Sequence, residues 1–81
     1  MKRKMFAQFL TTNLKNEVVT AIGSDGVYTL DARINPNTHV KSMTQRAKML
    51  NKNLGKNFVG VQICRGTYTN YSILKSVIFS K

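Results

Sequence analysis

Alternation of apolar and polar residues marks the clearest extended segment. From Val27 to Ile34, every second residue is apolar, beginning with Tyr28 and Leu30, and the residues between them are mostly polar. This alternation is the period of a half-buried β-strand. The short β-branched stretch from Glu17 to Ile22 precedes it, and the sequence Gly23-Ser24-Asp25-Gly26 between them ends in Asp-Gly, a strong signal for a hairpin turn. The pattern therefore predicts a β-hairpin from Glu17 to Ile34.

The first apolar segment is compatible with two secondary structures. Four apolar residues recur at helical spacing, namely Phe6, Leu10, Leu14 and Val18. Residues 4–12 also fit an extended strand, with a turn at Asn13 to Asn16, because threonine and asparagine are poor residues for a helix interior and asparagine is common in turns. We therefore favour a strand followed by a turn and keep the helix as the alternative.

The middle of the chain carries the best-marked helix. Asn35 is a residue type that caps helix N-termini, and Pro36 is tolerated at the first helical position. An apolar stripe then recurs at steps of three and four residues, through Val40, Met43, Ala47, Leu50 and Leu54. Gly55 follows at the place where a left-handed C-cap residue is needed. The pattern predicts a helix from Pro36 to Leu54 with one apolar face.

Two more strands are predicted after the helix, over Phe58 to Cys64 and Ser72 to Phe79, with a turn-rich stretch from Gly66 between them. The order is then β-β-β-α-β-β. This order predicts an α+β fold, in which an antiparallel or mixed sheet is covered on one face by one amphipathic helix. A chain of 81 residues is long enough for one small domain, which we assign to residues 1–81.

Charge is distributed unevenly along the chain. Thirteen lysines and arginines stand against three acids, for a formal net charge of +10, and the acids Glu17, Asp25 and Asp31 all precede residue 32. A long stretch without carboxylates cannot neutralise its own cations, so an anionic partner is expected. Nucleic acid, either DNA or RNA, is the leading candidate for that partner. An acidic protein surface is the alternative.

The predicted helix gives this charge a direction. At about 100° per residue, Lys41, Lys48 and Lys52 fall on one stripe, nearly opposite the apolar stripe. The plainer interpretation of these lysines is an ordinary solvated helix face. The plainer interpretation of Tyr68 and Tyr71 is that the two tyrosines lie over the edge of the core. The nucleic-acid hypothesis assigns phosphate contacts to the lysines and arginines and base stacking to the tyrosines. Its residues are Lys41, Lys48, Lys52, Lys56, Arg33, Arg65, Tyr68 and Tyr71.

Groups that could carry catalysis are few. The titratable candidates are Glu17, Asp25, Asp31, His39 and Cys64. Asp31 stands two residues from Arg33 on the predicted strand, so a pair between these neighbours explains it. Tetrahedral zinc needs about four ligands, and no glycine-rich phosphate-binding motif is present. We expect no enzyme, no cofactor and no metal site, with a minimal nuclease that uses His39 or tyrosine side chains as a third hypothesis.

The remaining expectations concern the surroundings of the protein. Cys64 is the single cysteine and cannot form an internal disulfide, which suits a reducing, cytoplasmic location. No signal peptide and no run of about 18 apolar residues is recognised, so no membrane association is expected. The alternative function is that of a virus-type accessory protein, which binds and inhibits or adapts an acidic partner. A homodimer is kept as a hypothesis, because dimerisation would extend a small core.

Overall fold

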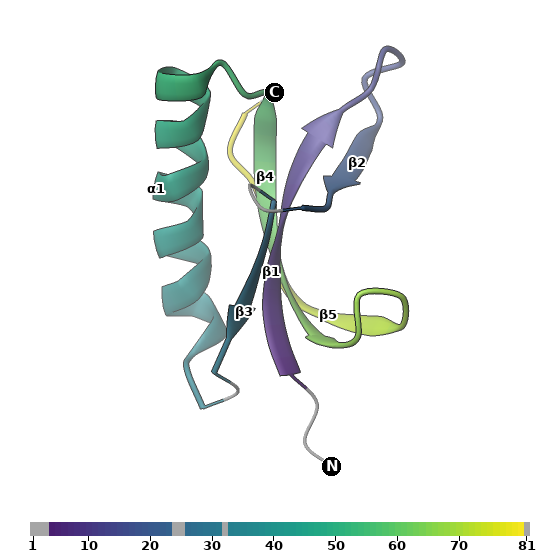
Figure 1. Ribbon diagram of the computed structural model, residues 1–81, viewed down its shortest axis with the longest axis vertical. Helices are drawn as coiled ribbons and strands as arrows, with labels where there is room; N and C mark the ends of the chain where they lie inside the picture. Colours follow the sequence, from purple (N-terminus) through teal and green to yellow (C-terminus); the bar gives the residue numbers. More distant parts are fainter. Residues whose placement is uncertain (1–3, 24–25, 32, 81) are drawn as a thin grey trace.

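One sheet and one helix make up the described part of the chain, as Figure 1 shows. The computed structural model describes residues 4–23, 26–31 and 33–80. The elements are β1 (Lys4–Thr12), β2 (Val18–Ala21), β3 (Val27–Leu30), α1 (Pro36–Leu54), β4 (Phe58–Gly66) and β5 (Tyr71–Ile78). All strand pairs are antiparallel, and α1 packs along one face of the sheet. The predicted α+β class and the β-β-β-α-β-β order are confirmed.

β1 is the central strand of the sheet. On one side it pairs with β4, from Lys4 opposite Gly66 to Thr11 opposite Phe58, and β4 pairs with the edge strand β5. On the other side β1 pairs with both β2 and β3. Because β3 and β4 are both antiparallel to β1, they run parallel to each other, and α1 forms the crossover between them.

The predicted hairpin from Glu17 to Ile34 is wrong, since β2 and β3 pair with β1 and not with each other. Phe9 pairs with Ala21 and its neighbour Gln8 pairs with Val27, so the two short strands follow each other along one edge of β1. The Phe9 amide donates to the Gly26 carbonyl at 2.8 Å across the break. The nine-residue β1 is long enough to pair with two four-residue strands in succession. Ser24 and Asp25 of the predicted turn lie outside the described residues.

The hairpin that does form joins β1 to β2, through the turn predicted at Asn13 to Asn16. The Asn16 amide donates to the Asn13 carbonyl at 3.0 Å, and the amides of Lys15 and Glu17 donate to the Asn13 side-chain oxygen at 2.9 and 3.0 Å. Asn16 adopts a left-handed φ of 63°, which asparagine tolerates better than most residues. The asparagines therefore close this turn.

β3 ends at Leu30, earlier than the predicted Ile34. The Asp31 carboxylate accepts a hydrogen bond from the Arg33 amide at 2.9 Å, and the Ile34 amide donates to the Asp31 carbonyl at 3.0 Å. Short polar side chains that bind nearby backbone amides favour turns over strands. Asp31 therefore stands in a turn and not on a strand; Ala32, also assigned to that strand, lies outside the described residues.

The choice of a strand for residues 4–12 is confirmed, and the helical alternative is wrong. Met5, Ala7 and Phe9 pack toward α1, while Phe6 and Leu10 are buried on the opposite face, at 2% and 4% exposure. A central strand buried on both faces has a nearly continuous apolar sequence. Such a run obscures the period of two by which half-buried strands are recognised.

The helix has the bounds and caps predicted from the sequence. The Asn35 side chain accepts from the Asn37 amide at 2.8 Å, and Gly55 adopts a left-handed φ of 66°. The predicted apolar stripe fails only at its end, where Leu54 is 61% exposed. Asn51 explains this, because its side chain exchanges two hydrogen bonds of 2.8 Å with the backbone of Phe58 and so joins the helix to β4 before the last turn.

Gly60 on β4 supports a testable prediction about packing. A Cβ at this position would lie 2.5 Å from the Val77 carbonyl oxygen and 2.8 Å from Cδ1 of Ile78, both on the neighbouring strand β5. We expect Gly60→Ala to lower the free energy of unfolding by about 1–3 kcal/mol, because the strands must separate to admit the methyl group. Urea unfolding measures this, with Ser76→Ala on the exposed side of β5 as the control. Equal stabilities of the two variants would contradict the close approach.

Candidate nucleic-acid interface

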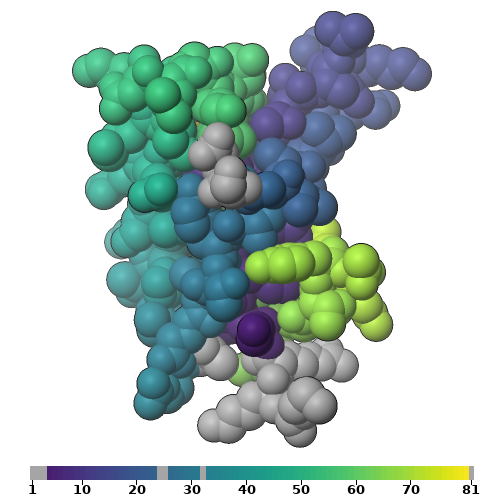
Figure 2. Space-filling model, in the orientation of Figure 1, coloured from purple at the N-terminus to yellow at the C-terminus, as the bar shows by residue number. Residues whose placement is uncertain are grey.

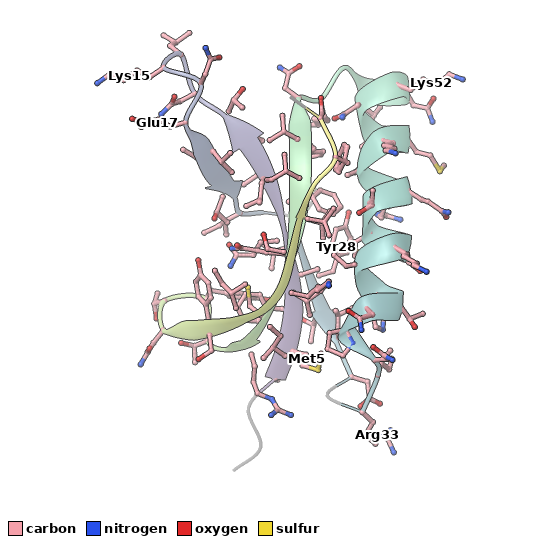
Figure 3. All side chains as sticks on the ribbon, turned by 180° about the vertical axis from the view of Figure 1, so that it is seen from behind. Met5, Lys15, Glu17, Tyr28, Arg33 and Lys52 are labelled. Carbon is pink, nitrogen blue, oxygen red and sulfur yellow. The ribbon has the colours of Figure 1, made fainter. Side chains whose placement is uncertain are left out.

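The lysines predicted to share one helix face do share it. Lys41, Lys48 and Lys52 are all exposed, because the helix packs into the core through the side that carries Val40 and Ala47. Figure 3 shows Lys52 pointing away from the sheet near the C-terminal end of α1. The amphipathic pattern thus positions these cations outward over more than two turns of the helix.

A groove between α1 and β5 brings two of these lysines opposite a third. Its volume is about 670 Å³, and its lining consists of Asn37, Val40, Lys41, Thr44, Gln45, Lys48, Lys75 and Val77, which we call the basic groove. Lys75 belongs to this surface because its register partner on β4 is Ile63, a core residue on the helix side of the sheet. The Lys48 ammonium lies 5.5 Å from the centre of the Phe79 ring, which draws its side chain toward β5.

The electrostatic surroundings of the basic groove are positive. No aspartate or glutamate follows Asp31 in the sequence, so Lys41, Lys48 and Lys75 have no acidic neighbours along their own elements. The first turn of α1 also contains no acidic residue, which leaves the positive end of the helix dipole uncompensated there. Glu17, at the far hairpin, accepts a hydrogen bond from the Asn13 side chain at 3.3 Å. The groove is therefore suited to an anion.

Arg33, a predicted phosphate contact, is engaged elsewhere. Its guanidinium forms an ion pair with the Asp31 carboxylate at 2.7 Å, and its Nε donates to both oxygens of that carboxylate. Hydrogen bonding from Arg33 lowers the pKa of Asp31 to about 2. The expected pair of neighbours is thus present. It occupies the turn before α1, and its net charge is close to zero.

Tyr68 and Tyr71 lie on the opposite face of the sheet from α1. Both rings meet the buried ring of Phe6 edge to face, with centroid distances of 4.6 and 5.6 Å. The Tyr68 hydroxyl is also 3.4 Å from the Thr29 hydroxyl on β3. The structure therefore brings the two tyrosines together with Phe6 but not with the lysines of α1. Their contacts match the plainer interpretation, in which they cover the edge of a core.

The two remaining predicted cations stand apart from the basic groove. Arg65 is exposed near the end of β4, paired in register with Met5 and Ser72. Lys56 follows the helix cap and lines a different hollow with Thr12 and Gly55. Sequence reasoning thus placed three of the cations correctly on one face and missed Lys75. The signal that could have found Lys75 is its position two residues before Val77, because residues two apart in a strand point to the same face.

Cys64 and His39, two of the candidate catalytic residues, lie in separate surroundings. Cys64 is buried, where desolvation raises the pKa of its thiol, and it accepts a weak hydrogen bond from the side-chain Nε2 of Gln8 at 3.5 Å. His39 is half-buried in the first turn of α1, and its Nδ1 atom has no hydrogen-bond partner among the described residues. Within residues 4–23, 26–31 and 33–80, no three histidine, cysteine or acidic side chains lie close enough to share a metal ion.

The fold and this surface define a small α+β protein in which a row of exposed lysines along one helix lies opposite a lysine of the adjoining edge strand. Comparison of the chain with protein-family models, with curated proteins and with solved structures found no match. No helix in the described part of the chain is long and apolar enough to cross a membrane.

Proposed function

We propose that this protein binds nucleic acid by laying the phosphate backbone along the exposed face of α1 and into the basic groove. The observation that carries the proposal is the meeting of Lys41 and Lys48 with Lys75 across that groove, in a chain with a net charge of +10. Lys52 extends the same face by one more helical turn. A row of cations on a rigid helix suits the regularly spaced charges of a nucleic-acid backbone.

The chemistry of the groove favours contacts that do not read sequence. Lysine offers a mobile point charge and not the fixed fork with which arginine recognises guanine. The stacking residues of the original hypothesis, Tyr68 and Tyr71, pack against Phe6 on the other face of the sheet. The proposed complex therefore depends on phosphate contacts, and base stacking on this surface has no support.

Fluorescence polarisation with short single- and double-stranded DNA and RNA tests the proposal. Three or four phosphate contacts should weaken duplex DNA binding by about 40- to 150-fold between 50 and 200 mM salt, because each contact contributes about 0.9 to the slope of log K against log salt. Sequence should have little effect on affinity. Binding that is insensitive to salt would overturn the proposal. A failure to bind all four probes would also overturn it and would leave an acidic protein as the partner to seek.

A further inference from the structure

The exposed part of α1 carries its cations on two flanks with an uncharged strip between them. At about 100° per residue, Lys41, Lys48 and Lys52 lie within about 20° of one line, and Arg46 lies about 140° around the helix from Lys41. Figure 2 shows α1, in teal and green, along most of one side of the molecule. The positions between the two flanks, which we call the neutral crest, hold exposed and uncharged residues, namely Thr38, Ser42, Gln45, Met49 and Asn53.

Arg46 is held in place on the flank of α1 that faces β3. Its Nε donates to the Tyr28 hydroxyl at 2.7 Å, and its guanidinium carbon lies 4.8 Å from the centre of the Tyr28 ring. Among the described residues, no acidic side chain pairs with Arg46, and its terminal nitrogens have no hydrogen-bond partner. A guanidinium fixed in this way keeps its terminal N–H groups available for phosphate oxygens.

We propose, as an inference that rests on the proposed function, that α1 lies in the major groove of double-stranded DNA, with one phosphate backbone in the basic groove and the other beside Arg46. The major groove of B-form DNA is about 12 Å wide and admits an α-helix, which is about 10–12 Å across with its side chains. The backbone that borders the major groove needs a hollow beside the helix. The basic groove between α1 and β5 provides that hollow, with a volume of about 670 Å³ and Lys75 on its far wall.

The neutral crest suits the floor of the major groove. The edges of the base pairs there present donors, acceptors and thymine methyl groups. Hydroxyl and amide side chains such as Ser42 and Gln45 both donate and accept hydrogen bonds, and Met49, which is 61% exposed, offers an apolar contact. Methionine is flexible enough to contact different base pairs, which agrees with an affinity that depends mainly on phosphates.

The same arrangement selects duplex DNA over the other nucleic acids. The major groove of duplex RNA is deep and narrow, so an α-helix does not enter it. A single strand has no groove to hold a helix, and its unpaired bases gain most from stacking on aromatic rings, which the lining of the basic groove does not contain. Only duplex DNA therefore engages both cationic flanks and the neutral crest together.

Fluorescence polarisation with duplex DNA, duplex RNA and single strands of one sequence tests this inference. Duplex DNA should bind at least about eightfold more tightly than duplex RNA at 0.1 M salt, because RNA loses the Arg46 contact and one phosphate contact is worth about that factor. Arg46→Gln should weaken the binding of duplex DNA by a similar factor and lower the salt slope by about 0.9. Lys15→Gln is its control, because it makes the same change in charge at the β1–β2 hairpin, away from α1 (Figure 3).

A charge on the neutral crest tests the position of the helix in the groove. Met49→Glu should weaken the binding of duplex DNA at least about tenfold, because the carboxylate would face the acceptor atoms of the base edges. Leu14→Glu is the matched control, since Leu14 is fully exposed beside Lys15 and the substitution makes the same change in charge. Circular dichroism should show both variants folded.

The outcomes distinguish this inference from the proposed function. Equal or tighter binding of duplex RNA or of single strands would overturn the major-groove inference and leave the proposed function intact. Equal losses of affinity for Met49→Glu and Leu14→Glu would do the same, because the crest would then make no contact with DNA. A failure to bind every probe would overturn the proposed function and, with it, this inference.

Discussion

Replacing Phe9 with alanine is expected to lower the free energy of unfolding by about 3–5 kcal/mol, which is the usual cost of removing a fully buried phenyl ring. Phe9 is 0% exposed on the central strand. Its ring centre lies 4.6 Å from that of Phe58 at the start of β4 and 5.1 Å from that of Tyr28 on β3. One side chain therefore joins three strands on the side of the sheet that α1 covers.

The size of this effect matters because small domains have a total stability of only about 5–15 kcal/mol, and an 81-residue core belongs near the lower limit. Urea unfolding followed by circular dichroism measures the change. Phe79→Ala is the matched control, since Phe79 is only partly buried at the margin of the same core, and we expect it to cost about 1–2 kcal/mol. If the two variants lose equal stability, the core is not centred on β1.

The elements that the sequence predicts well are those that local interactions determine. The bounds of α1 follow from Asn35 and Gly55, which bind or turn the backbone within one helical turn of themselves. The turn at Asn13 to Asn16 depends on bonds that span at most four residues. Signals of this kind are complete within a short window, so no knowledge of the rest of the fold is needed to interpret them.

Strand pairing is where prediction from the sequence fails. The turn signal between β2 and β3 favours a hairpin, but the free edge of β1 offers backbone hydrogen bonds to both strands. The two strands pair with β1 in succession, and the final pairing is decided by a strand that ends six residues before β2 begins and 15 residues before β3 begins. A hairpin signal describes how a segment pairs on its own. When β1 is present, pairing with β1 satisfies more of the backbone hydrogen-bonding groups of β2 and β3 than pairing with each other.

The same limit explains which residues of the candidate site were missed. Tyr68 and Tyr71 follow Arg65 closely in sequence, yet the sheet itself separates them from the lysines of α1, because their side chains pack on Phe6. Lys75 is far from α1 in sequence but faces it across the basic groove. The register irregularity beside Cys64 places Ile73 and Lys75 on opposite faces. A strict alternation along β5 places these two residues on the same face.

Reversing two charges in the basic groove is expected to have the largest effect on function. Under the proposed function, the double variant Lys41→Glu, Lys48→Glu should bind duplex DNA at least about 60-fold more weakly at 0.1 M salt, because each lost phosphate contact is worth about eightfold there. The slope of log K against log salt should also fall by about 2. Both substitutions lie on the exposed face of α1, so circular dichroism should show an unchanged fold.

The matched control separates a defined binding surface from net charge alone. The double variant Lys4→Glu, Lys15→Glu makes the same change in charge, from +10 to +6, but alters the start of β1 and the tip of the β1–β2 hairpin. Figure 3 shows Lys15 at that tip, on the side of the molecule away from α1. A surface on α1 predicts a small loss of affinity for this variant and little change in salt slope. Equal losses for the two double variants would mean that the whole charge of the chain attracts nucleic acid and that the basic groove has no separate role, because attraction by overall charge depends on the net value and not on the positions that carry it.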